Sequence, residues 1–460
     1  MWIFFFLMLN SFGLPPDFEF GVANAPGQVE DHLNDTWLAW GQAGKIAGWK
    51  TTPKPEERLD FWSHPEIEID LALRLGVKTF RLGVDWGRIM PSESGFDPEA
   101  LEGYRKILRL INSGGMKVML TLMHHSVPVW FMEKGGWHKP ANANHFIKFS
   151  QKIMTEFHED VDSWITFNEA NVFVVNSYTI GMWPPGEKKS PLSLLAFGPY
   201  TGTSIEALDH MAQAHNILYD WAHTRYPFVK MGVAHNMARY KGRGPFNKIS
   251  AFVADSMMNW RFPEMIRGKM DFFGFNYYGA EWIAGKSVEF HPDFEYSEAG
   301  RAIDVNGLYE ILKEISERFP KLPIVITENG IADTEDGIRS AYIIEHLMAV
   351  EKAIAEKIPV KGYFVWSLTD NLEWSDGYCP QFGLVKVNRE TGERIPRRSF
   401  EVMQKIFTEG MMPGVLRVEE WKRVTELFGK ERPFCRDNDG VTAYGTPAKR
   451  KYNSVDWRFR

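Results

Sequence analysis

Val161–Glu169 has the sequence VDSWITFNE, and Leu322–Gly330 has the sequence LPIVITENG. Each is an apolar, β-branched run that ends in a glutamate beside an asparagine, and such runs are typical of buried strands. A carboxylate at the end of a buried strand is held rigidly, and two such carboxylates are what cleavage or transfer of a glycosidic bond requires. We therefore expect Glu169 and Glu328 to face each other across one cleft.

Six further runs follow the same plan, so the chain has eight predicted strands. They span 18–23, 79–84, 118–123, 164–167, 231–234, 272–275, 324–327 and 362–366. Between them lie segments with apolar residues every three or four positions, which is helical spacing. These segments span 66–75, 101–112, 146–157, 203–223, 307–319 and 340–357. Alternating strands and helices predict parallel pairing, and eight such units predict a (β/α)8 TIM barrel.

The length of 460 residues fits a single α/β barrel domain with insertions and a short C-terminal extension. We predict an apolar N-terminal segment at 1–14, a catalytic barrel at 15–410 and a basic extension at 411–460. Residues 1–10 are too short an apolar stretch to span a bilayer and lack the Lys or Arg that opens a signal peptide. They are either a weak membrane-touching segment or the remains of a truncated leader.

The charge distribution excludes one class of partner and favours two interpretations of the tail. The net charge is −6, so wholesale nucleic-acid binding is not predicted. Residues 411–460 carry 11 Lys and Arg against 7 Asp and Glu, a net +4, which leaves −10 for the rest. A basic tail on an acidic barrel suits an anionic membrane surface, or the tail is a solvated strap across the barrel.

The chain has two cysteines, Cys379 and Cys435. They can be bridged or free, and nothing near them has the spacing of zinc ligands. We predict neither a multi-disulfide framework nor a metal site.

Polar residues follow the predicted strands where a TIM barrel builds its active site. They are Gln28, Arg81, His124, His125, Asn168, Glu169, His235, Asn236, Asn276, Tyr278, Glu328 and Trp366. Amides, imidazoles, two carboxylates and a guanidinium form a set suited to many hydroxyl groups and one reacting centre.

Several of these residues also have structural explanations. His124 and His125 could bind a metal, but adjacent residues on a strand point to opposite faces, so we expect one of them to be packed or paired. We predict that His235 packs at the barrel end, and that Trp86 and Trp137 are structural.

The chain resembles glycoside hydrolase family 1, the β-glucosidase and β-galactosidase family. The resemblance rests on an ordered set of motifs between residues 18 and 408. They include RLGVDWGRIMP at 81–91, TLMH at 121–124, TFNE at 166–169, DFFGFNYY at 271–278, ITENG at 326–330 and WSLTDNLEW at 366–374. Membership would make Glu328 the nucleophile and Glu169 the acid/base of a retaining mechanism.

The resemblance implies roles for other residues. Arg81 and Tyr278 match residues that hold the nucleophile, and Asn276 joins the predicted catalytic group. The predicted sugar-binding residues are Gln28, His124, Asn168, Trp366, Glu373 and Trp374. No cofactor and no metal are implied. Retention also requires one ionised and one protonated carboxyl near neutral pH, so we expect the Arg81 guanidinium to favour the charged form of Glu328.

The chain departs from the family pattern at two positions. Ala170 follows Glu169 where proline is usual, which frees Glu169 from the backbone restriction that a following proline imposes. His125 stands where an aromatic residue is usual, which puts the ordinary sugar contacts in doubt. We expect altered geometry at the rim rather than lost chemistry.

A finer resemblance is to the galactolipid galactosyltransferase branch of the plant chloroplast envelope. It rests on residues 116–125, 295–301, 307–309, 431–434 and 456–459. It implies galactosyl transfer between galactolipids through a covalent glycosyl-enzyme, with peripheral membrane association at the plastid envelope in a plant or alga, and a cytoplasmic location otherwise. The apolar loop at 190–197 would receive acyl chains, or it packs on its own barrel.

Two other functions stay open. One is a β-glucosidase or β-galactosidase that hydrolyses soluble β-glycosides, because the same two glutamates serve water and sugar acceptors alike. The other is a noncatalytic sugar- or lipid-binding barrel. Galactose or glucose preference, the acceptor and the oligomeric state do not follow from these residues.

Overall fold

The computed structural model describes residues 12–188, 200, 202–285, 287–436 and 443–460. The predictions for residues 1–11 and for the loop at 190–197 lie outside the described residues. Within them, no helix is long and apolar enough to cross a membrane.

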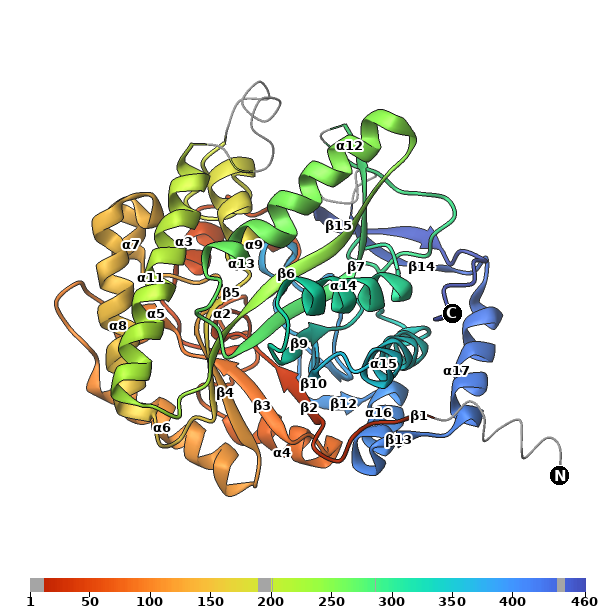
Figure 1. Cartoon of the computed structure of the whole chain (residues 1–460), viewed down its shortest axis with the longest axis horizontal. Coiled ribbons are helices and arrows are strands. Elements are labelled where there is room, and N and C mark those ends of the chain that lie inside the picture. Colours follow the sequence, from red (N-terminus) through yellow and green to blue (C-terminus); the bar gives the residue numbers. More distant parts are fainter. Residues whose placement is uncertain (1–11, 189–199, 201, 286, 437–442) are drawn as a thin grey trace.

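Eight parallel strands close into a barrel, which confirms the predicted fold (Figure 1). The barrel strands are β2 (Glu19–Ala23), β3 (Thr79–Gly83), β4 (Lys117–Met123), β5 (Ser163–Asn168), β6 (Met231–Gly242), β7 (Phe272–Ala284), β9 (Ile324–Asn329) and β10 (Val360–Val365). Their order is β6-β5-β4-β3-β2-β10-β9-β7, and pairing of β6 with β7 completes the ring. The carboxyl ends of all eight strands therefore meet at one mouth.

Strands β6 and β7 continue well beyond the predicted ends at residues 234 and 275. They stay paired along the whole extension, with Arg239 opposite Ala280 and Gly242 opposite Ile283. The apolar pattern stops at the barrel mouth. Beyond it, the backbone N–H and C=O groups of the two strands still hydrogen-bond to each other, so the paired strands extend above the barrel. Figure 1 shows this pair leading to α12 (Gly244–Ala254).

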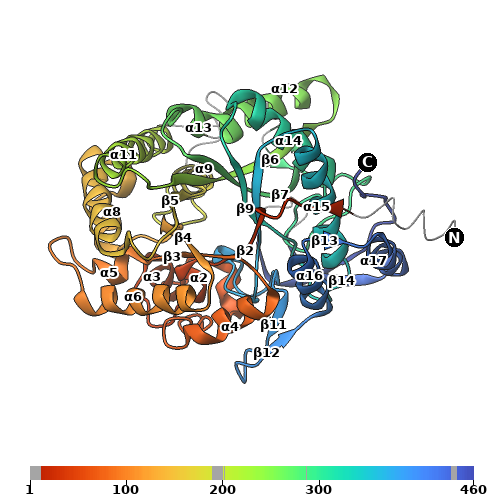
Figure 2. The same ribbon diagram turned by 60° about the horizontal axis from the view of Figure 1, so that its bottom comes forward.

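Helices surround the barrel, as Figure 2 shows. The six predicted helices correspond to α4 (Pro65–Leu75), α6 (Pro98–Ser113), α8 (Ala143–Phe157), α11 (Thr203–Arg225), α14 (Val305–Arg318) and α15 (Arg339–Ala355). Among the described residues, the other α-helices are α2 (Pro26–Val29), α3 (Thr36–Gln42), α5 (Trp86–Ile89), α7 (Val129–Glu133), α9 (Ala170–Val175), α13 (Arg261–Met265), α16 (Arg398–Glu409) and α17 (Gly414–Leu427). Short or irregular turns are η1 (Ala47–Thr51), η2 (Gly136–His138), η3 (Pro140–Asn142), η4 (Asn176–Ile180), η5 (Asp255–Trp260) and η6 (Trp374–Asp376).

The hydrophobic core has two parts. Six barrel strands each contribute one buried side chain to a small cluster, namely Met119, Ile165, Ala234, Phe272, Val325 and Phe364. A larger core joins the strands to the helices. Trp86 and Trp137 are buried in this larger core among phenylalanines, and His235 is buried against Phe262 with its Nε2 2.9 Å from the Met258 carbonyl, so the structural interpretation of these three residues is confirmed.

The C-terminal residues lie across the barrel as a strap. Short strands pair as β1 (Phe12–Gly13) with β13 (Met411–Met412), β11 (Val385–Val387) with β12 (Arg394–Pro396), β14 (Glu431–Arg436) with β15 (Ala443–Lys451), and β8 (Ser287–Val288) with β7. Basic residues of the tail pair with barrel carboxylates: Arg417 with Glu345 at 2.7 Å and Arg432 with Glu295 at 2.5 Å. The tail therefore packs on the barrel as a strap, and its contact with an anionic membrane surface stays a prediction. Cys379 and Cys435 form a disulfide.

Gly330, directly after β9, tests how closely the barrel ends pack. A Cβ atom at this position would lie 1.6 Å from the Trp366 carbonyl oxygen, so backbone would have to move. We expect Gly330→Ala to lower the free energy of unfolding by about 3 kcal/mol or more, measured by urea denaturation. Gly13→Ala is the control, because its Cβ would meet no atom within 4 Å. Equal stability of the two variants would contradict this packing.

Candidate active site

A buried guanidinium connects three strands at the barrel mouth. Arg81, on β3, donates from Nη1 to Glu328 Oε1 on β9 and from Nη2 to Asn168 Oδ1 on β5, each at 2.6 Å. Tyr278, on β7, donates its hydroxyl to Glu328 Oε2, also at 2.6 Å. Both carboxylate oxygens of Glu328 are therefore held in place. The predicted contacts of Arg81 and Tyr278 with Glu328 are present.

Glu169 lies directly after β5, with φ +47° and ψ +52° in the left-handed region. A following proline disfavours helical backbone at the residue before it and favours extended backbone, so Ala170 suits this conformation. The carboxylate is held by two amides: Asn276 and Asn236 each donate to Glu169 Oε1 at 2.9 Å. Asn276 also donates to Asn168 Oδ1 at 3.0 Å, which joins Glu169 to the network around Arg81.

His124 and His125 both point toward Asn168, so the prediction of opposite faces is wrong. Strand β4 ends at Met123, and His125 has φ +60°, which breaks the alternation that a strand would impose. Asn168 Nδ2 lies 2.9 Å from His124 Nε2, and His125 Nε2 lies 3.4 Å from Glu169 Oε2. Since a carboxylate only accepts, His125 carries its proton on Nε2. His124 accepts on Nε2 and carries its proton on Nδ1, which has no partner among the described residues.

The remaining predicted sugar-binding residues gather around one carboxyl group. Trp366, directly after β10, donates from Nε1 to Glu373 Oε1 at 3.1 Å. Gln28, on α2, contacts Glu373 and donates to Asn371 at 3.3 Å, and its buried Oε1 has no partner among the described residues. Burial raises the pKa of Glu373 to about 8, because the hydrogen bond from Trp366 only partly compensates. These groups can donate to and accept from sugar hydroxyls.

A cavity of about 180 Å³ contains both glutamates. Eight predicted site residues line it, namely His124, Asn168, Glu169, Tyr278, Glu328, Trp366, Glu373 and Trp374. The other three predicted residues do not line the cavity but contact residues that do. Arg81 contacts Glu328, Asn276 contacts Glu169, and Gln28 contacts Glu373. The structure therefore brings all eleven predicted site residues to one place.

The pKa values of the two glutamates are separated, but in the reverse of the expected order. Burial raises the pKa of Glu328 to about 7 despite the opposing Arg81 charge, and the charge of Glu169 adds to the rise. Burial also acts to raise the pKa of Glu169, but hydrogen bonds from His125, Asn276 and Asn236 outweigh it, so this pKa lies below the usual value of a glutamate. Arg81 does favour the charged form of Glu328, as expected, but burial outweighs its effect, and more N–H groups face Glu169, so Glu169 has the lower pKa of the two.

Sequence reasoning missed five residues of the site. Asn236 and His125 were noticed but not assigned to it, although both contact Glu169. Arg301, Asp376 and Arg436 also line the cavity. Two signals were available: Arg301 ends the motif at 295–301, and Arg436 follows Cys435, whose pairing the sequence left open.

The sequence profile of glycosyl hydrolase family 1 matches residues 11–262 and 261–411. This match covers most of the chain and agrees with the barrel and the two strand-end glutamates. The chain belongs to glycosyl hydrolase family 1, and it is an enzyme that processes glycosyl groups.

Two plant proteins are similar over most of the chain. "Galactolipid galactosyltransferase SFR2, chloroplastic" of Arabidopsis thaliana is 35% identical, over 96% of this chain and 82% of that protein. "Beta-glucosidase-like SFR2, chloroplastic" of Oryza sativa subsp. japonica is 39% identical, over 90% of this chain and 67% of that protein. Among solved structures, a β-glycosidase from Pyrococcus horikoshii is 30% identical with a TM-score of 0.80, covering 89% of this chain and 98% of that one.

His125→Phe tests the cause of the low pKa of Glu169. The variant removes the N–H that stabilises the charged carboxylate, so we expect the pKa of Glu169 to rise. The measurement is infrared titration of the carboxyl band, with Glu169→Gln used to assign the signal. His145→Phe is the matched control, because His145 pairs with Glu93 outside the cavity. An unchanged titration of Glu169 in His125→Phe would contradict this cause.

Proposed function

We propose that Glu328 and Glu169 carry out a retaining double displacement on a β-glycoside. The observation that carries the proposal is that the two carboxyls line one cavity and are joined by one hydrogen-bond network through Asn276, Asn168 and Arg81. In the first step, Glu328 attacks the anomeric carbon while Glu169 protonates the departing oxygen. In the second step, Glu169 takes a proton from the acceptor hydroxyl, and Glu328 is released.

The electrostatics favour the second step. Once Glu328 forms the glycosyl ester it loses its charge, and the N–H groups of His125, Asn276 and Asn236 keep Glu169 ionised as a base. The first step needs the opposite distribution, with the proton on Glu169. The charge of Glu169 raises the pKa of Glu328, so the protonation of one carboxyl affects the other, and donor binding must move one proton to Glu169.

The donor and acceptor we propose are galactolipids, with diacylglycerol as the leaving group. Support comes from the galactolipid galactosyltransferase of Arabidopsis thaliana, which is similar over 96% of this chain. Hydrolysis of soluble β-glycosides is the competing function, and it is supported by a β-glucosidase A of Acetivibrio thermocellus that is 28% identical over 84% of this chain. The same two glutamates serve both functions, so only the products distinguish them.

Product analysis distinguishes the two functions. With monogalactolipid in liposomes we expect diacylglycerol and lipids that carry more than one galactose, separated by thin-layer chromatography. Free galactose as the sole sugar product would contradict transfer and favour hydrolysis.

Glu328→Gln tests the chemistry itself. The amide cannot attack the anomeric carbon, so we expect the rate of product formation to fall by a factor of at least ~100. Glu426→Gln is the control, because Glu426 is exposed on α17. Retained activity in Glu328→Gln would contradict the proposed nucleophile.

We further propose that α12 contacts the lipid surface. Phe246, Ile249, Phe252 and Val253 lie on one face of α12 and are exposed, Phe246 by 85% and Phe252 by 71%. Lys248 is exposed on the same helix, and Arg243 is exposed directly before it. An apolar face with cations and no acidic residue suits a membrane that contains anionic lipid. Strand β6 ends at Gly242, six residues beyond Asn236, and α12 begins at Gly244, so the end of the strand lies roughly 20 Å along the chain from Asn236.

A variant with Phe246→Ser and Phe252→Ser tests this surface. We expect its binding to vesicles of monogalactolipid and phosphatidylglycerol to fall at least about tenfold in flotation assays, because two aromatic side chains no longer enter the lipid. Phe228→Ser is the matched control: Phe228 is 96% exposed but lies before β6, at the other end of the strand. Equal binding of the two variants would contradict the role of α12.

A further inference from the structure

A second group of polar residues lines the cavity that holds the two glutamates. Its members come from the segment after β7, from η6 and from β14, and they are Ser297, Arg301, Ser375, Asp376 and Arg436. None of them is needed to hold Glu169 or Glu328. Two guanidiniums, a carboxylate and two hydroxyls offer both donors and acceptors, which is what a sugar ring with adjacent hydroxyls requires.

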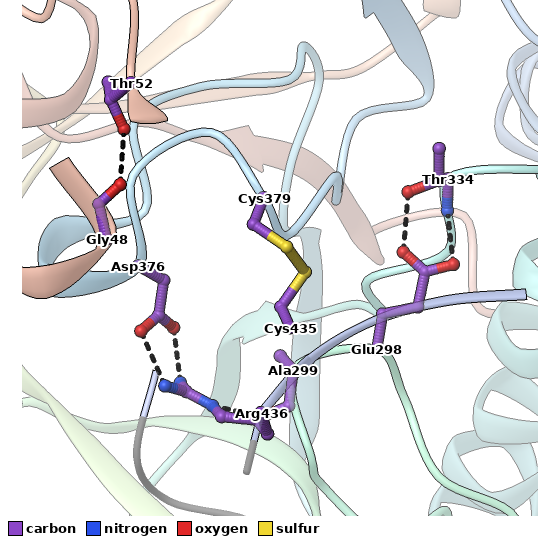
Figure 3. The surroundings of a disulfide bond; sticks show 9 residues. All are labelled: Gly48, Thr52, Glu298, Ala299, Thr334, Asp376, Cys379, Cys435 and Arg436. Atoms are coloured by element: carbon purple, nitrogen blue, oxygen red, sulfur yellow. Dashed lines mark hydrogen bonds and ion pairs between the residues drawn. A yellow bond between two sulfur atoms is a disulfide. The ribbon is translucent and has the colours of Figure 1, made fainter. Parts of the chain in front are cut away.

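Arg436 is anchored on two sides, as Figure 3 shows. It donates from Nε to the Ala299 carbonyl at 2.9 Å and from Nη1 to Asp376 Oδ1 at 2.6 Å, and its Nη2 pairs with Asp376 Oδ2. The Arg436 side chain is 14% exposed and that of Asp376 is 8% exposed. A planar guanidinium held in this way is already ordered before a ligand binds. Binding of a sugar would therefore cost little conformational entropy in the protein.

The disulfide and the strand β14 place Arg436 at this position. Cys435, the preceding residue, is buried and bridged to Cys379, which lies three residues after Asp376. The Cys435 N–H donates to the Glu298 carbonyl at 2.8 Å, and Arg432 pairs with Glu295. The C-terminal strand thus holds the segment at 295–301 as well as Arg436.

Arg301, at the end of that segment, extends the same surface toward the reacting groups. Its guanidinium pairs with the buried carboxylate of Glu281 on β7. Arg301 lines the same cavity as Glu169, Asp376 and Arg436, and the two carboxylates attract its charge whereas Arg436 repels it. The surface therefore lies beside the residue that would activate an acceptor hydroxyl.

We propose that Arg301, Asp376 and Arg436 bind a second sugar, the hexosyl group that leaves with the aglycone or accepts the transferred residue. The proposal rests on the double displacement described above. During transfer, an acceptor hydroxyl oxygen forms the new bond to the anomeric carbon, while the bond from that carbon to the Glu328 carboxylate breaks. The hydroxyl proton passes to Glu169, and Glu328 returns as a carboxylate.

Two glycosyl donors, compared as substrates of variants of the full chain, test whether this site binds a sugar. One is a β-galactosyl disaccharide, whose leaving group is a sugar, and the other is a nitrophenyl β-galactoside, whose leaving group is not. We expect Arg436→Gln to lower the ratio of kcat/KM for the disaccharide to kcat/KM for the nitrophenyl glycoside at least tenfold. The double variant Cys379→Ser with Cys435→Ser should lower the same ratio, because it releases Arg436. Arg458→Gln is the matched control, since Arg458 pairs with Asp456 near the C-terminus and not in the cavity.

An unchanged ratio in Arg436→Gln, or a ratio lowered equally in Arg458→Gln, would overturn the proposal. A lowered ratio in the cysteine variant alone would also overturn it, because the disulfide would then act without Arg436. The measurement uses hydrolysis, so it still tests this site if the enzyme transfers nothing to galactolipid. Absence of turnover on both donors in the unmodified protein would instead contradict the double displacement itself.

Discussion

The site depends on one buried guanidinium. Arg81 binds Glu328 and Asn168 at once, so a single side chain joins β3, β5 and β9 where the barrel opens. Removing one partner of a buried ion pair typically costs about 3 to 5 kcal/mol, because the other charge is left unpaired in a poorly solvating interior. Asn276 donates to Asn168 and Tyr278 donates to Glu328, so both partners of Arg81 are also held from β7. The hydrogen-bond network therefore includes four strands. The barrel therefore supplies both the fold and the fixed geometry of the two carboxyls.

This network explains why two glutamates in similar sequence settings differ in acidity. Glu328 is held by one cation and one hydroxyl, and burial prevails, whereas Glu169 receives N–H groups from an imidazole and two amides. His125 is one of the two positions at which the chain departs from the usual family pattern, and it belongs to that set of donors. The departure thus changes the surroundings of Glu169, the proposed acid/base residue, rather than only the proposed contacts with a sugar.

The eight strands and nine of the eleven site residues are encoded locally, in apolar runs and in the polar residues that follow them, whereas Glu373 and Trp374 were predicted only from the family resemblance. The sequence did not predict the features that depend on contacts between residues far apart in the chain. The extension of β6 and β7 depends on pairing between the strands, and the common direction of His124 and His125 depends on a single positive φ at His125. The second polar surface depends on a disulfide that joins residues 56 positions apart, which no local pattern reveals.

Arg436 of the C-terminal strap lines the cavity together with the barrel residues, and this shared lining is where we propose that a second sugar binds. The central premise is still that Glu328 becomes covalently glycosylated. Mass spectrometry of the peptide that contains residues 324–329, after reaction with a 2-fluoro β-glycosyl donor that slows the second step, tests it directly. We predict a mass increase of one fluorosugar on Glu328. A label on another residue, or complete turnover with no labelled peptide in an acid-quenched sample, would contradict it.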